Sequence, residues 1–261
     1  MFDYHMHTTV SFDGHDTGLA MARAAKAAGL REICFTDHLD YDPQGKMENI
    51  AFDTEKYNRE YDDLEVPGLL IRRGMEFGML PDNTEQLEKD LQRRKFDFVL
   101  GSVHFAGNED VYFTEFWDGK SVFEGERQYL EDTLACVLAH DDFDVLAHLT
   151  YAAKARCNPS HRPVPIAEHR EIIDEILRVL VKKGKGLEMN TSGVARSGGF
   201  LPTADYFHRF KELGGEIVTV GSDAHRSNRV GQYCRDACDI LKDIFGYVCT
   251  FEERNPIFHK L

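Results

Sequence analysis

The sequence predicts an α/β protein in which seven parallel strands form a closed or nearly closed barrel with helices outside it. Two observations support this fold class: short apolar runs alternate with helical periods along all 261 residues, and no Pro/Gly/Ser-rich linker interrupts them. Repeated β-then-α units imply parallel strands covered by helices. The unit count and the chain length favour a barrel, and residues 1–261 are expected to form a single domain. A doubly wound open sheet is the alternative.

The predicted strands are short apolar segments, each followed by a helical period. They are residues 2–7, 32–36, 69–71, 98–103, 145–147, 186–190 and 216–220. A further apolar segment, residues 247–251, predicts a short closing strand before a polar terminus.

The segments between these strands carry helical signals. Helices are expected near residues 17–28, 54–64, 83–94, 122–139, 173–183, 203–213 and 228–245. The clearest apolar stripe has helical spacing and consists of Ile173, Ile176, Leu177, Leu180 and Val181. Its intervals of three and four residues put these side chains on one helix face. Gly29 and Gly184 are predicted helix stops.

Composition and charge argue against some classes of protein, namely nucleic-acid-binding, membrane-spanning and secreted proteins. The net charge of −14 argues against a surface that binds nucleic-acid backbones, although a local pocket can still hold a small anion. No apolar run approaches the roughly 18 residues of a membrane span, and a motif that begins at residue 3 leaves no room for a signal peptide. The six cysteines form no C-x-x-C pair and are interpreted as buried, reduced thiols. We therefore expect a cytoplasmic protein with neither a membrane nor nucleic acid as partner.

Metal-ligand residue types follow six of the seven predicted strands. They are His5, His7, His38, Glu76, His104, His148, Asp223 and His225. The carboxyl ends of parallel barrel strands converge on one face, so these side chains should meet there. A cluster of imidazoles and carboxylates without thiolates suits zinc, iron or manganese. Each residue alone has an ordinary structural explanation, such as a hydrogen-bonded His or a turn Asp; their repetition predicts a metal centre.

In this order the motifs resemble the PHP (polymerase and histidinol phosphatase) superfamily. The matching motifs are His5-Met6-His7, Asp37-His38, Glu76, His104, His148 and Asp223-Ala224-His225. The resemblance covers nearly the whole chain. It implies a distorted (β/α)7 barrel with the active site at the C-terminal ends of the strands, and a centre of two to three divalent metal ions.

The resemblance also implies which residues bind each ion. The first metal would be held by His5, His7, Glu76 and Asp223. Glu76 would bridge to a second metal that also binds His104 and His148. The third would take His38, His225 and a ligand six residues after His7, which is Asp13, with His15 as a competitor.

Such a centre predicts hydrolysis of a phosphate ester. A hydroxide bridging two divalent ions is available at neutral pH and could attack phosphorus in line, while the cations neutralise charge on the phosphoryl oxygens. Glu76, Asp223 and His225 are the candidate catalytic residues. The proton for the leaving alcohol could come from His225, from Asp223 or from metal-bound water.

Two arginines are candidate phosphate ligands. Arg156 follows the fifth strand, and Arg196 follows the sixth strand in a loop that begins Thr191-Ser192-Gly193. The resemblance implies that arginines in these loops bind the substrate phosphate. Each could instead be a surface residue, with Lys154, His161 and Arg162 as substitutes.

The loop 105–124 is the predicted specificity element. Its acidic and aromatic residues could receive a cationic, imidazole-bearing substrate, or could simply be solvated around one aromatic anchor. They are Glu109, Asp110, Glu115, Phe116, Trp117 and Asp118.

The chain resembles the histidinol-phosphate phosphatase branch, which implies hydrolysis of L-histidinol phosphate in histidine biosynthesis. The alternative is a PHP phosphoesterase that acts on nucleotides or nucleic acid, such as an exonuclease or a nucleoside bisphosphate phosphatase. A non-catalytic domain is disfavoured by the complete ligand set. The sequence does not predict the oligomeric state.

Overall fold

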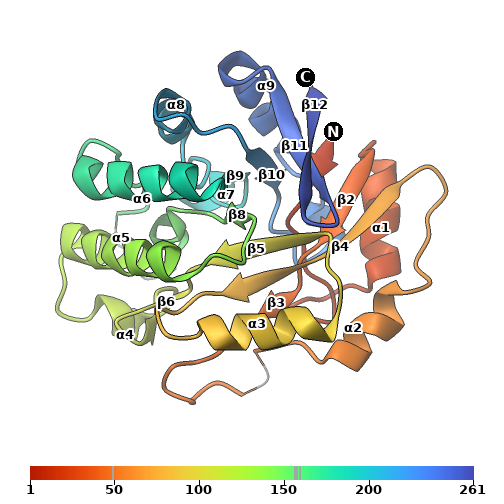
Figure 1. Cartoon of the computed structure of the whole chain (residues 1–261), viewed down its shortest axis with the longest axis horizontal. Helices are drawn as coiled ribbons and strands as arrows, with labels where there is room; N and C mark the ends of the chain where they lie inside the picture. Colours follow the sequence, from red (N-terminus) through yellow and green to blue (C-terminus); the bar gives the residue numbers. More distant parts are fainter. Residues whose placement is uncertain (49, 156–157, 159) are drawn as a thin grey trace.

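A barrel of parallel strands organises the chain (Figure 1). The computed structural model describes residues 1–48, 50–155, 158 and 160–261. The strands that form the barrel wall follow the order β1 (Phe2–Asp3), β2 (Glu32–Phe35), β4 (Leu70–Gly78), β5 (Phe98–Ser102), β8 (Val145–Leu146), β9 (Gly186–Asn190) and β10 (Val218–Gly221). Each of the seven predicted strand segments overlaps one of them, although β4 and β10 extend beyond the predicted ends.

Contacts between the first and last of these strands close the barrel. The Tyr4 amide donates to Val220 O at 2.9 Å, and the Asp223 amide donates to His5 O at 2.7 Å. Met6 forms an isolated parallel bridge with Ala224. The predicted barrel is therefore confirmed, and the open doubly wound alternative is wrong.

Helices surround this sheet in the predicted order (Figure 1). They are α1 (Gly18–Ala27), α2 (Thr54–Tyr61), α3 (Thr84–Arg93), α5 (Val122–Ala139), α6 (Arg170–Lys183), α8 (Ala204–Glu212) and α9 (Cys234–Ile244). Helix α5 begins with a capping box between Ser121 and Glu124, and α6 ends where Gly184 adopts φ 65°. Helix α9 starts later than predicted because a 3₁₀ turn (Ser227–Arg229) and a loop precede it.

The second strand is broken at Thr36-Asp37. Its continuation, β3 (His38–Leu39), pairs with the end of β4, with His38 opposite Glu76. β4 is longer than predicted, so Glu76 lies within a strand and not beyond its end. This break brings the His38 side chain to the carboxyl end of the barrel.

The C-terminal tail differs from the prediction. Residues 247–251 do not close the barrel; β11 (Tyr247–Glu252) forms an antiparallel hairpin with β12 (Asn255–Lys260), beside the N-terminus (Figure 1). Phe251 packs against Phe98 with ring centroids 4.7 Å apart, and its carbonyl accepts a hydrogen bond from the Tyr4 hydroxyl. Because β1 and β10 already close the barrel, the hairpin instead covers its amino-terminal end.

The cysteines and the helix lengths agree with the expectations from composition within the described residues. The five cysteines among them are buried and unbridged, as predicted for reduced thiols; Cys157 lies outside the described residues. Within the same part of the chain, no helix is both long and apolar enough to cross a membrane.

Candidate metal centre

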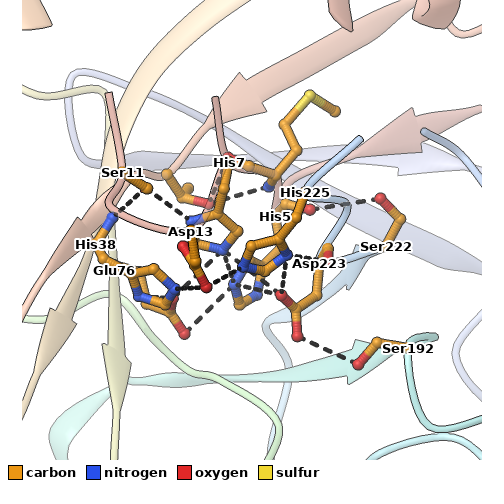
Figure 2. A network of polar contacts seen from close by, with 12 residues as sticks. His5, His7, Ser11, Asp13, His38, Glu76, Ser192, Ser222, Asp223 and His225 are labelled. Carbon is orange, nitrogen blue, oxygen red and sulfur yellow. Dashed lines mark hydrogen bonds and ion pairs between the residues drawn. The ribbon is translucent and has the colours of Figure 1, made fainter. Parts of the chain in front are cut away.

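Imidazole and carboxylate groups converge at the carboxyl end of the barrel (Figure 2). The structure brings together the nine predicted ligands His5, His7, Asp13, His38, Glu76, His104, His148, Asp223 and His225. They come from the ends of different strands and from the first loop. The alternation of side chains along the extended segment His5-Met6-His7 turns both histidines to the same side.

Glu76 lies at the middle of this cluster. Its Oε1 is close to three imidazole nitrogens: His148 Nε2 at 2.8 Å, His5 Nε2 at 3.3 Å and His104 Nε2 at 3.4 Å. Its Oε2 lies 2.9 Å from His38 Nδ1 and 3.5 Å from His7 Nε2. Burial alone would raise the pKa of Glu76, but the positive charges on His5, His38 and His104 hold it well below its ordinary value. Glu76 is therefore an ionised carboxylate shared by five imidazoles.

Asp223 faces the N-terminal histidines. Its Oδ1 is 3.5 Å from His7 Nε2 and 3.9 Å from His5 Nε2. Asp223 and His148 both have positive φ, at 53° and 21°. Non-glycine residues rarely adopt this backbone conformation, and those that do cluster at functional sites because surrounding contacts must enforce it.

Asp13, and not His15, reaches the third group of ligands. Its Oδ2 lies 3.0 Å from His225 Nε2 and 3.7 Å from His38 Nε2. The His15 ring instead meets the Arg226 guanidinium, with Nε2 and Nη2 3.0 Å apart. The geometry therefore favours Asp13, the residue that the spacing indicated.

In four of the histidines, Nδ1 forms a hydrogen bond with a group outside the ring. We call it the outer nitrogen, because Nε2 of these rings faces the other ligands. The partner of Nδ1 is Glu188 Oε1 for His5 (2.7 Å), Asp40 Oδ1 for His104 (2.7 Å), Ser11 Oγ for His7 (3.3 Å) and Asp223 O for His225 (2.9 Å). Metal-binding histidines are oriented in this way, because the outer hydrogen bond fixes the tautomer and leaves the inner nitrogen free to coordinate.

Sequence reasoning did not identify Glu188, Asp40 or Ser11. The sequence contains a hint of a buried role for Glu188, since it is a charged residue inside an apolar strand segment. Asp40 lies two residues after His38 and therefore on the same side of an extended chain. Ser11 had no comparable signal, because its position depends on the conformation of the first loop.

The donor set fits divalent cations. Asp13 Oδ1 is buried and has no hydrogen-bond partner among the described residues. A buried polar atom left unpaired costs about 1–3 kcal/mol, which a bound cation would offset. At this end of the barrel, four groups of described residues have ligand atoms within 4.8 Å of one another: His5/His7/Asp223, His5/Glu76/His148, His7/His38/His225 and His38/Asp40/His104. Nitrogen and oxygen donors in such groups suit zinc, iron or manganese.

The cluster forms the floor of a cavity of about 770 Å³. Among the described residues, four cationic side chains line this cavity: Lys154, Arg196, Arg226 and Arg229. The Lys154 ammonium contacts Asp223 Oδ2. Arg196 donates to Lys154 O at 3.2 Å, and its guanidinium stacks over the Tyr112 ring at 5.2 Å. A cavity with cations above a ligand cluster can bind a phosphate group.

One of the two predicted phosphate ligands, Arg196, lines the cavity and is exposed to solvent. Arg156 lies outside the described residues. Lys154, which the sequence suggested only as a substitute for these arginines, directly contacts Asp223 of the ligand cluster.

Residues 3–192 match the family model for the PHP domain. The chain belongs to the PHP domain family. A histidinol-phosphatase of Lactococcus lactis is 34% identical to this PHP protein over 232 residues, which are 87% of this chain and 85% of the relative. A probable histidinol-phosphatase of Thermotoga maritima is 30% identical over 246 residues, which are 93% of this chain and 91% of the relative.

A solved structure is similar to this PHP protein over its whole length. The crystal structure of histidinol phosphate phosphatase from Lactococcus lactis, complexed with zinc, L-histidinol and phosphate, matches with a TM-score of 0.87 and 30% identity. The match covers 98% of each chain.

We expect Glu188→Gln to lower the metal affinity of this PHP protein by about 10–100-fold, with a parallel loss of activity. Both Glu188 oxygens accept hydrogen bonds, from His5 Nδ1 and from the His148 amide at 2.9 Å. An amide must turn its NH₂ group toward one of these donors. If the NH₂ group faces His5, Nδ1 must accept its hydrogen bond. The imidazole proton of His5 then lies on Nε2, the nitrogen that faces the ligand cluster.

Metal content after dialysis against a graded chelator measures this effect. The control is Glu32→Gln, which alters a buried carboxylate outside the ligand cluster: Glu32 Oε1 lies 3.0 Å from Arg72 Nε. Equal metal retention by both variants would show that Glu188 does not position His5.

Proposed function

We propose that this protein is a metal-dependent histidinol-phosphatase, which hydrolyses L-histidinol phosphate to L-histidinol and phosphate in histidine biosynthesis. The observation that carries the proposal is the ligand cluster on the floor of a cation-lined cavity. It occurs in a chain 34% identical to a histidinol-phosphatase, and the similar crystal structure holds zinc, L-histidinol and phosphate. A cytoplasmic location and a single domain over residues 1–261 are part of the proposal.

The proposed ligands are those that the motifs indicated. His5, His7, Glu76 and Asp223 would bind one ion; Glu76, His104 and His148 a second; Asp13, His38 and His225 a third. Zinc is the metal in the similar structure, and iron or manganese would suit the same donors. When bound, such ions act as Lewis acids toward phosphoryl oxygens and provide a nucleophile at neutral pH.

The side chains of this protein would bind and orient the substrate. Arg196 and Lys154 line the cavity and can neutralise the phosphate charge, and we also assign Arg156 to this role. Glu76, Asp223 and His225 are the proposed catalytic residues.

Asp223 contacts both the histidines of the ligand cluster and Lys154, one of the cationic residues that line the cavity. Its Oδ1 faces His5 and His7, and its Oδ2 contacts Lys154. Burial would raise the pKa of Asp223, but Lys154 and His5 hold it well below its ordinary value. The carboxylate is therefore ionised, the form in which it can bind a metal ion and pair with the Lys154 ammonium.

A substrate panel tests the proposal. Metal-loaded protein is assayed for phosphate release from L-histidinol phosphate, p-nitrophenyl phosphate and adenosine 3′,5′-bisphosphate, and for degradation of single-stranded DNA. We expect kcat/KM for L-histidinol phosphate to exceed that for the other two monoesters by at least about 10²-fold, because sites built around a substrate's polar groups reject analogues that lack them. Hydrolysis of the other substrates without hydrolysis of L-histidinol phosphate would overturn it.

A further inference from the structure

A small hairpin brings Asp110 to the cavity wall. Strands β6 (Phe105–Ala106) and β7 (Glu109–Asp110) pair antiparallel directly after His104, with Phe105 opposite Asp110. The Val111 amide donates to His104 O at 2.9 Å, which fixes this end of the hairpin beside a proposed metal ligand. Asp110 is half-buried and lines the cavity, whereas the neighbouring Glu109 accepts a hydrogen bond from Gln44 Nε2 at 2.7 Å.

Asp110 differs from the other acidic residues of the cavity. Among the described residues, the carboxylates lining it are those of Asp13, Glu76, Asp110 and Asp223. Three of these lie within ion-pair distance of histidines of the cluster, but Asp110 has no Lys, Arg or His within that distance in the described part of the chain. Its Oδ1 accepts a hydrogen bond from the Tyr112 amide at 2.8 Å.

Among the described residues, Asp110 has no directly paired cationic side chain. Burial raises the pKa of the Asp110 carboxyl, and the hydrogen bond from the Tyr112 amide and the positive charges of His104 and His38 only partly oppose this effect. A half-buried carboxylate without a counter-ion is unfavourable, and a cation delivered by a ligand would relieve that cost.

Asp110 also marks a junction between two hollows. A smaller hollow of about 300 Å³ adjoins the main cavity, and Met47, Asp110 and Phe113 line both. The Phe113 ring is 48% exposed although it is a large apolar side chain. A negative charge therefore lies beside apolar surface that a flat ring could cover.

We propose that Asp110 binds the α-ammonium group of the substrate and selects phosphate monoesters of amino alcohols. This inference rests on the proposed function and deepens it. An alkyl ammonium group is fully charged at neutral pH, whereas an imidazole with a pKa near 6.5 is largely neutral there. The ammonium is thus the charge partner for Asp110, and the imidazole ring has Met47 and Phe113 as apolar neighbours.

The test compares two substrates in three proteins. The substrates are L-histidinol phosphate and 3-(imidazol-4-yl)propyl phosphate, which lacks only the amino group; the proteins are wild type, Asp110→Asn and the matched control Glu109→Gln. A hydrogen bond to a charged group contributes enough for a discrimination of about 10–100-fold in kcat/KM. We expect wild type and Glu109→Gln to prefer L-histidinol phosphate by this factor.

We expect Asp110→Asn to lose the preference through a higher KM for L-histidinol phosphate, with hydrolysis of the analogue unchanged. An unchanged preference in Asp110→Asn, or an equal fall for both substrates, would overturn the role of Asp110. If wild type hydrolysed neither substrate, the proposed function itself would be overturned. The analogue is an internal control for folding and metal loading, because a general defect lowers both rates.

Discussion

Glu76→Gln is expected to lower phosphate release from L-histidinol phosphate by about 10³-fold. Both oxygens of Glu76 face imidazole nitrogens, and Oε1 also accepts a hydrogen bond from Ser102 Oγ at 2.6 Å. An amide of the same shape removes the negative charge and presents a donor to nitrogens that must coordinate. The variant should therefore lose both proposed sites that share this carboxylate.

Steady-state kinetics and metal content measure the effect, and thermal unfolding verifies the fold. Glu32→Gln is a suitable control, because Glu32 is a buried carboxylate of the same barrel at its other end, where it pairs with Arg72 at 3.0 Å. The control should retain the wild-type kcat. Glu76→Gln with wild-type kcat would contradict a role of Glu76 in catalysis.

Asp13→Ala is expected to lower kcat/KM by about 10²-fold, whereas His15→Ala should change it less than about threefold. Asp13 Oδ2 lies 3.0 Å from His225 Nε2, and its Oδ1 is buried without a partner among the described residues. His15 meets Arg226 instead. The two residues share one loop, so each variant controls for disturbance of that loop.

Metal content is the second measurement on this pair. Asp13→Ala should bind one ion fewer per chain than His15→Ala does. The opposite order would assign the third site to His15.

The barrel and the ligand positions could be predicted because both follow from local rules. Side chains alternate along an extended segment, so His5 and His7 had to share a face. Parallel strands in one barrel share an edge, so residues such as His104 and His148 had to approach one another. Asp13 and His15 could not be separated in this way, since the conformation of a loop decides which side chain reaches His225.

The residues behind the ligands depend on packing that local rules do not describe. Glu188 meets His5 across 183 residues of sequence because β9 and the N-terminal strand lie on either side of β10. Gly221 permits this approach: a Cβ there would lie 2.2 Å from Glu188 Oε1 and 2.3 Å from His5 Cβ. Nothing in the local sequence indicates that requirement.

The C-terminal hairpin was missed for a different reason. Its turn consists of Glu253 and Arg254, which adopt φ values of 46° and 68°. Turns of this kind usually contain Gly, Asn or Asp, so two charged residues gave no hairpin signal.

Restoring metal to chelator-treated protein tests the central claim most directly. L-Histidinol phosphate hydrolysis is followed while zinc, iron or manganese is added in steps to the stripped chain, and bound metal is measured in the same samples. We predict no activity without metal and a rise that saturates at two to three ions per chain. Undiminished hydrolysis by protein without measurable metal would contradict the account.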